Sequence, residues 1–356
     1  MVDIIEILKN AVSLDVADVF IVAGAPVSFK MHNKIYNDNI EKLFPNDTEN
    51  ILKQIYALAE NRNIDILKEK GDDDFSFSIA GVSRFRVNAY KQRGSLAAVI
   101  RIIRFELPDY KKLNIPENVI NIAEKTNGLV LVTGSAASGK STTLACIIDR
   151  INQTKNNHII TLEDPIEYLH SHKRSIVSQR EVSMDTVNFI EALRSAMRQS
   201  PDVILLGEMR DYETIRAAVT AAETGHMIIS TLHTLGASNS IDRIIDAFPV
   251  EQQQQIRVQL SMVLSAVVSQ QLIPTVYGNV VPVFEVMYAN TAIRNLIRES
   301  KIHQIDNVIM TSAGEGMISM DASILRLYKE GIISYENALG YSINPNQMAK
   351  KIDILK

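Results

Sequence analysis

An eight-residue segment of the sequence has the composition of a phosphate-binding loop. It reads Gly134-Ser135-Ala136-Ala137-Ser138-Gly139-Lys140-Ser141 and fits the pattern G-x-x-x-x-G-K-[ST]. An apolar run that predicts a strand ends at Thr133, and a helical pattern begins at Lys140, which is the context that such a loop requires. Backbone N–H groups of the turn would face a polyphosphate, Lys140 would reach its outer phosphates, and Ser141 would ligate Mg²⁺. The sequence therefore predicts an ATP and magnesium site made of this loop and the following Thr142.

The interior of this loop is unusual. Ser135, Ala136, Ala137 and Ser138 fill the turn, whereas many such loops carry proline and additional glycine there. Small side chains still let the backbone approach a phosphate, but Ala137 accepts a positive φ less freely than glycine does. We therefore expect the altered loop to affect the rate of hydrolysis more than the fold.

Carboxylates follow two further predicted strands. Glu208 comes just after the apolar run 203–206, which is how the acidic partner of a phosphate loop is usually presented, and it is the second candidate magnesium ligand. Glu163, Asp164 and Glu167 lie just beyond the run 158–162, where open α/β sheets place their ligands. One of these acids can act as a general base for water. The alternatives are an acid that merely ends a strand and, for the cluster, ordinary surface charge.

Histidines and arginines are weaker candidates. His226 and His233 flank a predicted strand, and no further His or Cys clusters nearby, so a metal site is not expected there. His233 is the better placed to sense a terminal phosphate, although a structural histidine is the alternative. Arg86 and Arg101 lie in predicted strands near the amino terminus. Exposed arginines of this kind are usually only solvated, but a guanidinium can also stabilise a transferred phosphoryl group from another domain or subunit.

The elements that must position these residues change in style near residue 112. Before it, short alternating runs predict strands, and one segment with an apolar face predicts a helix that Asp47 or Thr48 can cap. The predicted strands are 18–22, 75–79, 84–90 and 96–103. Two prolines and no periodicity mark 105–116 as a linker. Residues 1–112, linker included, are therefore predicted to form a small α+β domain.

Residues 113–356 are predicted to form an α/β domain. Buried apolar runs alternate with helical patterns, which implies a parallel sheet covered on both faces. The predicted strands are 129–133, 158–162, 203–206 and 227–230, and the predicted helices include 189–199, 212–223, 292–299, 320–330 and 335–340. The chain is thus expected to end in a helical region.

Composition narrows the functional classes. The 356 residues are 46% hydrophobic, which is enough for two cores of ordinary size. A net charge of -4 gives no basic surface for nucleic acid. Cys146 is the only cysteine, so neither an intramolecular disulfide nor a zinc site of several thiolates can form. With no signal peptide and no apolar run of the ~18 residues that cross a bilayer, we expect a cytoplasmic protein that contacts the membrane only through a partner.

The order of these motifs resembles that of the type II/type IV secretion and pilus ATPase superfamily. Four boxes of that family have counterparts here, namely the phosphate loop, the acidic cluster 163–167, Gly207-Glu208-Met209-Arg210-Asp211, and the histidine-containing segment 225–234. Segments 292–299 and 316–321 further resemble the pilus-retraction (PilT-type, twitching motility) branch. The similarity covers nearly the whole chain.

The resemblance implies a homohexameric ring whose subunits pair a PAS-like amino-terminal domain with a RecA-like ATPase domain, with ATP between the two. It implies removal of pilin at the inner membrane, through a pilus platform protein and with a paralogous retraction ATPase as a further candidate partner. Carried over by position, Glu167 is the general base, Glu208 ends the Walker B strand, and His233 contacts the terminal phosphate region. Arg86 and Arg101 match the charge-stabilising arginines of the amino-terminal domain.

Two other functions stay open. An assembly or type II secretion motor of the same superfamily commonly carries a four-cysteine zinc insert, which a chain with Cys146 alone cannot build. A weakly hydrolysing regulatory paralogue is conceivable because of the altered loop, although the presence of all the catalytic carboxylates argues against it.

Overall fold

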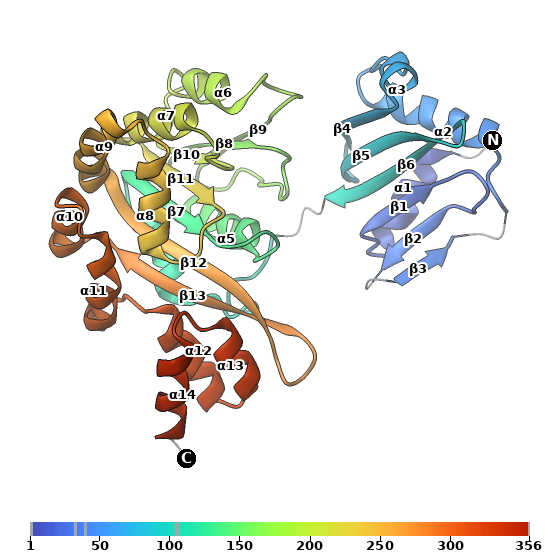
Figure 1. The fold of residues 1–356 in the computed structure, drawn as a ribbon. Coiled ribbons are helices and arrows are strands. Elements are labelled where there is room, and N and C mark those ends of the chain that lie inside the picture. The colour runs from blue at the N-terminus through green and yellow to red at the C-terminus, as the bar shows by residue number, and fades with distance from the viewer. Residues whose placement is uncertain (1–2, 32–33, 39–40, 104–106, 355–356) are drawn as a thin grey trace. The chain divides into compact units, whose positions relative to one another are not determined.

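The computed structural model describes residues 3–31, 34–38, 41–103 and 107–354, which fall into two compact units divided between residues 106 and 107 (Figure 1). Residues 105 and 106 of the predicted linker lie outside the described residues. Its remainder, 107–116, forms turns and irregular backbone that belongs to the second unit. The thiol of Cys146 in this unit donates a hydrogen bond to the carbonyl of Pro108 at 3.3 Å, which ties the start of the unit to its core.

The amino-terminal unit is an antiparallel sheet with the strand order β3-β2-β1-β6-β5-β4. Its strands are β1 Asp18–Ile21, β2 Ser28–Met31, β3 Lys34–Asn37, β4 Asp72–Ile79, β5 Ser83–Gln92 and β6 Ser95–Ile103. Its helices are α1 Ile4–Ser13, α2 Pro45–Leu58 and α3 Asp65–Lys70, and their apolar side chains share one core with the sheet. All four strands predicted in this region are confirmed, whereas β2, β3, α1 and α3 were not predicted.

Helix α2 begins earlier than the sequence indicated. Pro45 occupies its first turn, where a missing N–H is no loss. Asp47 lies in that first turn, and its carboxylate accepts a hydrogen bond from the N–H of Phe44 at 2.8 Å. The prediction that Asp47 or Thr48 caps the helix was therefore wrong. The N-cap residue is Phe44, and Asp47 lies inside the first turn, where it accepts a hydrogen bond from that residue.

The second unit is built on a seven-stranded sheet with the order β13-β12-β7-β11-β10-β8-β9. Its strands are β7 Gly128–Thr133, β8 His158–Glu163, β9 Ile176–Glu181, β10 Val203–Leu206, β11 Met227–Leu232, β12 Leu264–Pro274 and β13 Val280–Tyr288. Its α-helices are α4 Glu117–Ile120, α5 Lys140–Thr154, α6 Phe189–Ala196, α7 Tyr212–Glu223, α8 Ala237–Asp246, α9 Val250–Val263, α10 Thr291–Arg298, α11 Ile305–Thr311, α12 Met320–Lys329, α13 Tyr335–Tyr341 and α14 Pro345–Asp353. Short 3₁₀ helices cover Asn121–Glu124, Ile302–Gln304 and Ala313–Glu315.

Neighbouring strands of this sheet are parallel, except that β13 runs antiparallel to β12. The four strands predicted here are confirmed. The hairpin of β12 and β13 and the edge strand β9 were missed. Strand β12 follows helix α9 directly, with no glycine, proline or turn residue to mark the change.

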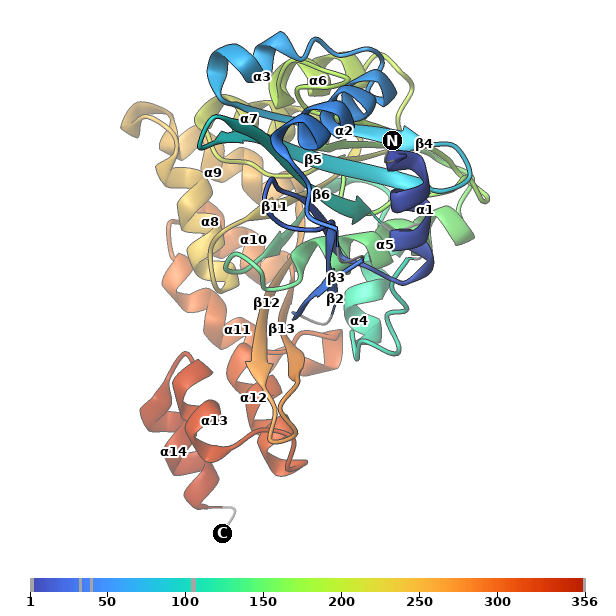
Figure 2. The ribbon, with the colours of Figure 1, turned by 90° about the vertical axis from the view of Figure 1, so that its right-hand side faces the viewer.

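Two hydrophobic layers cover the sheet, as its buried alternation predicted. One face packs against α6 to α11, and the other packs against α4, the first 3₁₀ helix and α5. Successive residues of a strand enter different layers, as Leu129 and Val130 of β7 do. The carboxyl-terminal helices α12 to α14 form a smaller core with the outer part of the β12–β13 hairpin (Figure 2). The expected helical end of the chain is therefore confirmed.

None of the helices in the described ranges has both the length and the apolar composition that a bilayer crossing needs.

One buried carboxylate joins three parts of the second unit. Glu285 of β13 is 3% exposed, and its two oxygens accept hydrogen bonds from the N–H groups of Ala237 at 2.8 Å and Met320 at 3.3 Å. These are the first residues of α8 and α12. The carboxylate thus satisfies N–H groups at the starts of two helices that are far apart in sequence.

We expect Glu285→Leu to lower the free energy of unfolding by about 1–3 kcal/mol, because two buried N–H groups lose their acceptor. Calorimetric unfolding of the full chain measures this change. Glu299→Leu, an exposed acid that pairs with Lys301, is the control and should change stability by less than about 0.5 kcal/mol. Equal stability of the two variants would contradict the role given to Glu285.

Candidate active site

The phosphate loop joins β7 to α5, and close contacts require its two fixed glycines. A β-carbon on Gly134 would lie 2.3 Å from the carbonyl oxygen of Gln270, and one on Gly139 would lie 2.9 Å from the side-chain nitrogen of Gln270. The φ angles of both glycines are positive, 148° and 86°. The buried Gln270 side chain comes from β12 and accepts a hydrogen bond from Thr143 Oγ1 at 2.7 Å. This glutamine packs beneath the loop and was not found from the sequence.

Ala137 occupies the left-handed region of the backbone, with φ 59°. An L-residue other than glycine pays roughly 1–2 kcal/mol for that conformation. The sequence predicted that alanine would accept it less freely, and the loop adopts it all the same. The Ser-Ala-Ala-Ser interior therefore forms the turn, and Ala137 adds a conformational cost to it.

The amine of Lys140 lies inside the loop. Its Nζ donates hydrogen bonds to the carbonyls of Gly134 at 2.9 Å and Ser135 at 2.8 Å. Burial lowers the pKa of the Lys140 amine, and the charges of Glu167 and Glu208 partly offset this by raising it. The two carboxylates are thus close enough to act on the lysine that would meet the phosphates.

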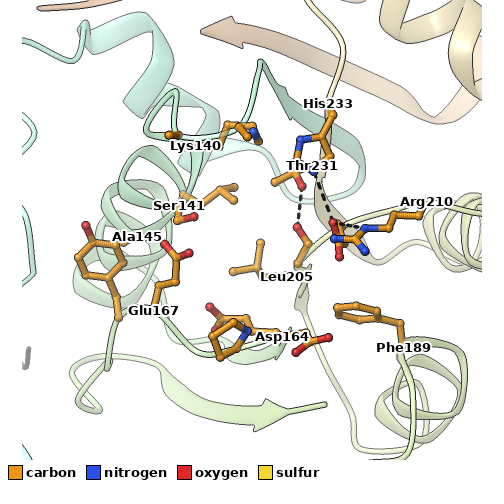
Figure 3. Close-up of a pocket in the computed structure, with 18 of the residues that line it drawn as sticks. Lys140, Ser141, Ala145, Asp164, Glu167, Phe189, Leu205, Arg210, Thr231 and His233 are labelled. Carbon is orange, nitrogen blue, oxygen red and sulfur yellow. Dashed lines mark hydrogen bonds and ion pairs between the residues drawn. The ribbon is translucent and has the colours of Figure 1, made fainter. Parts of the chain in front are cut away.

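The loop and the start of α5 form one wall of a cavity of about 260 Å³, and the other walls are residues in or just after β8, β10 and β11, together with Phe189 of α6 (Figure 3). These parallel strands end at one edge of the sheet, which is where the sequence placed the ligand. The candidate residues that line this cavity are Ala136, Ala137, Lys140, Ser141, Glu163, Glu167, Glu208 and His233. The structure therefore brings together residues that are up to 97 positions apart, counted from Ala136 to His233 (233 − 136).

The other candidates of the loop have different surroundings. Gly134, Ser135, Ser138 and Gly139 contribute to the turn itself, whereas Thr142 Oγ1 shares a hydrogen bond of 2.9 Å with the hydroxyl of Tyr168. The Ser138 hydroxyl is buried and has no hydrogen-bond partner among the described residues. A buried hydroxyl left in this way fits a loop whose ligand carries acceptor oxygens.

Glu208 lies at the centre of a small charged group. One of its oxygens is 2.7 Å from Arg210 Nε and 3.5 Å from His233 Nε2. The Glu208 side chain is 16% exposed, whereas those of Arg210 and His233 are 74% and 51% exposed. The imidazole thus stands beside the carboxylate at the wall of the cavity. Arg210 was not singled out from the sequence, although it stands two residues after Glu208 in a quoted motif.

Glu163 is held by two hydrogen bonds to one carboxylate oxygen. Thr161 Oγ1 donates at 2.6 Å and Gln179 Nε2 donates at 3.3 Å. Burial raises the pKa of Glu163 to about 7, while these two hydrogen bonds and the backbone of Glu167 act in the opposite direction. The carboxyl therefore changes its protonation near neutral pH.

Glu167 is exposed and extends toward the amino terminus of α5, with its carboxylate on the side of Ser141 (Figure 3). Among the carboxylates that act on the charge of Lys140, Glu167 has the largest effect. Within the acidic cluster it is thus the residue best placed for a water that attacks a phosphate held by the loop.

The residues present fit a magnesium ion that is bound together with a nucleotide. The Ser141 hydroxyl and the Glu208 carboxylate line the same cavity and are oxygen ligands, which Mg²⁺ prefers. Within the part of the chain that the structure describes, no group of three His, Cys, Asp or Glu side chains could hold a metal by itself. Mg²⁺ usually takes one or two protein oxygens and completes its shell with phosphates and water, and this set of ligands matches that habit.

Arg86 and Arg101 belong to the amino-terminal unit. They are direct partners across the antiparallel pair β5–β6, and buried Phe85, Val87, Ile100 and Ile102 flank them on the opposite face. Arg101 Nε also donates to Asp18 at 2.8 Å, while its side chain remains 64% exposed. One face of that sheet therefore presents two adjacent guanidinium groups, a pairing that sequence spacing did not reveal.

Residues 3–307 match the family model of type II/IV secretion system proteins. The chain is 43% identical over 336 residues to the type IV pilus retractation ATPase PilT of Pseudomonas aeruginosa, which covers 94% of this chain and 97% of that protein. It is also 43% identical over 321 residues to a twitching motility protein of Neisseria gonorrhoeae, with 90% and 85% covered. The crystal structure of the pilus retraction motor PilT with bound ADP superimposes with a TM-score of 0.90 at 44% identity, covering 98% of this chain and 100% of that one.

We expect Glu163→Gln to raise the unfolding temperature more at about pH 8 than at about pH 5. Burial raises the pKa of this carboxyl from 4.5 to about 7, so between these values the folded chain holds a proton that the unfolded chain has lost. The contribution of Glu163 to stability therefore falls as the pH rises through this window, and glutamine removes the effect. Scanning calorimetry of the full chain measures it, with Glu191→Gln, an exposed acid on α6, as control. Equal shifts at both pH values would contradict the expectation.

Proposed function

Because the chain belongs to the type II/IV secretion system protein family, we propose that it is a magnesium-dependent motor ATPase that drives retraction of type IV pili. This membership confirms the family resemblance and the RecA-like ATPase fold expected from the sequence. The observation that carries the function is the meeting of Lys140, Ser141, Glu167 and Glu208 in one cavity of a chain so similar to a retraction ATPase.

Each of these cavity residues has a different role in the proposed hydrolysis. Lys140 exchanges the loop carbonyls for phosphate oxygens, and the loop N–H groups hold the nucleotide. Ser141 and Glu208 would hold Mg²⁺, which would supply positive charge to the phosphates. Glu167 accepts the proton of the attacking water. The protein thus contributes position and electrostatics, which are the main requirements of phosphoryl transfer.

Residues around this centre have supporting roles in the proposal. His233 links the γ-phosphate position to Glu208, and Glu163 adds a carboxyl whose protonation changes near neutral pH. Arg86 and Arg101 are charge-stabilising groups that the amino-terminal unit supplies to a nucleotide, in the same or a neighbouring subunit. Their pairing on one face of the sheet, with Arg101 64% exposed and Arg86 half-buried, supports this role.

The proposed assembly is a homohexameric ring at the cytoplasmic side of the inner membrane. It would act on the platform protein of the pilus machinery, with a paralogous retraction ATPase as a second partner. The support is the similarity to PilT over almost the whole chain.

We expect Glu167→Gln to lower kcat of the full chain by about 10²- to 10⁴-fold, with the affinity for ADP unchanged, because only the base is lost. Phosphate release measures turnover, calorimetry measures ADP binding, and Lys140→Ala defines the background. Glu191→Gln, an exposed acid on α6, is the matched control and should retain full activity. Turnover of the unmodified chain no faster than that of Lys140→Ala would disprove the ATPase function.

We expect deletion of the gene in its native host to leave cells with excess surface pili and no twitching, because pili would be assembled and not retracted. Electron microscopy counts the pili, and restoration by the unmodified gene but not by Lys140→Ala would link the phenotype to hydrolysis. Deleted cells without any pili would instead point to an assembly motor.

A further inference from the structure

The segment that carries Glu167 has no helix or strand of its own. It covers residues 164–175, between β8 and β9. In such a segment the position of a side chain depends on contacts from neighbouring elements. The contacts that hold this segment therefore determine where the carboxylate of Glu167 lies.

One side chain makes two of these contacts and a third to Glu163 at the end of β8. Gln179 of β9 accepts a hydrogen bond from the N–H of His170 at 2.7 Å through its Oε1. Its Nε2 donates to the carbonyl of Tyr168 at 2.9 Å and to the carboxylate of Glu163 at 3.3 Å. The amide thus uses both of its ends, one as acceptor and the other as donor. It joins the turn just after Glu167 to the other acid of the cluster.

Neighbouring contacts restrain the same turn from both sides. Glu181 is 4% exposed and accepts a hydrogen bond from the N–H of Ile166 at 3.1 Å. It stands two residues after Gln179 and so lies on the same face of β9. The hydroxyl of Tyr168 bonds to Thr142 in the first turn of α5. Glu167 therefore lies between a residue held by Glu181 and a residue held by Gln179 and Thr142.

The register of β8 and β9 explains why Gln179 reaches both acids. These strands are parallel, and Gln179 pairs with Thr161, so both side chains stand on the same face. Thr161 and Gln179 donate to the same oxygen of Glu163. A single amide thereby couples the orientation of Glu163 to the turn that presents Glu167.

We propose that Gln179 is a positioning residue for ATP hydrolysis, which fixes the turn that presents Glu167 and orients the carboxylate of Glu163. This inference rests on the proposed ATPase function. It assigns to an edge strand a part in the reaction that the phosphate loop and the acidic cluster do not supply. Glutamine suits the task because alanine makes none of the three hydrogen bonds and glutamate can make only the one it accepts.

Steady-state kinetics of the full chain with Mg-ATP tests the proposal. We expect Gln179→Ala to lower kcat by roughly 10²-fold through misplacement of the base, while the Kd for ADP changes less than about threefold. Gln179→Glu should lose at least as much. It keeps the acceptor for His170, but it loses both donated hydrogen bonds and sets a carboxylate against Glu163. Ser178→Ala, on the other face of β9 and bonded to His158, is the matched control and should keep its kcat. Full activity of Gln179→Glu would overturn the proposal.

A double-mutant cycle separates positioning from general loosening of the strand. If Gln179 acts through Glu167, then Gln179→Ala should lower turnover no further than about twofold in the Glu167→Gln background. A second full loss of about 10²-fold there would overturn the proposal.

Amide hydrogen exchange keeps this test independent of the proposed function. Exchange in residues 164–172 should be faster in Gln179→Ala than in Ser178→Ala, with equal exchange in the helices of both variants. Equal exchange in that segment would overturn the positioning role of Gln179 even in a fully active enzyme. Absence of turnover in the unmodified chain would disprove the ATPase function. The exchange result would still show whether Gln179 holds the 164–172 segment.

Discussion

Strands β7, β8, β10 and β11 are parallel and end at one edge of their sheet, and the site depends on this alignment. Leu162 pairs with Leu206, and Thr133 pairs with Leu232, so the segments that follow these residues start side by side. A slip of one residue would send each side chain to the opposite face and carry the carboxylates away from the phosphate loop. The two hydrophobic layers prevent such a slip, because each accepts only every second residue of a strand.

Burial acts on both signs of charge at the edge that this alignment creates. It lowers the pKa of Lys140 and raises the pKa of Glu163, so both groups are drawn toward their neutral forms. The charges of Glu167 and Glu208 partly offset the effect of burial on the pKa of the lysine, and hydrogen bonds from Thr161 and Gln179 partly offset it for Glu163. The site is thus a set of mutually supporting charges, in which a change at one residue alters the protonation of its neighbours.

The sequence predicted the features that depend on short segments and missed those that depend on residues far apart in the chain. The phosphate loop, the strands that bear Glu163 and Glu208, and the alternation that buries them are properties of short segments, and they were predicted correctly as elements. Gln270 and Gln179 were missed because their partners lie elsewhere in the sequence, Thr143 in one case and the 164–175 segment in the other. The adjacency of Arg86 and Arg101 likewise depends on strand register, and β12 was hidden because no breaker separates it from α9. Long-range pairing therefore decided what was missed.

The thiol of Cys146 has a consequence for redox chemistry and for labelling. It is buried, donates to the carbonyl of Pro108, and burial raises its pKa to about 12, so little thiolate exists at physiological pH. The only native sulfhydryl of the chain is thus shielded from oxidants and alkylating probes. Cysteines introduced on the two units would react in its place, and a pair of fluorophores attached to them would report motion between the units without removal of a native residue.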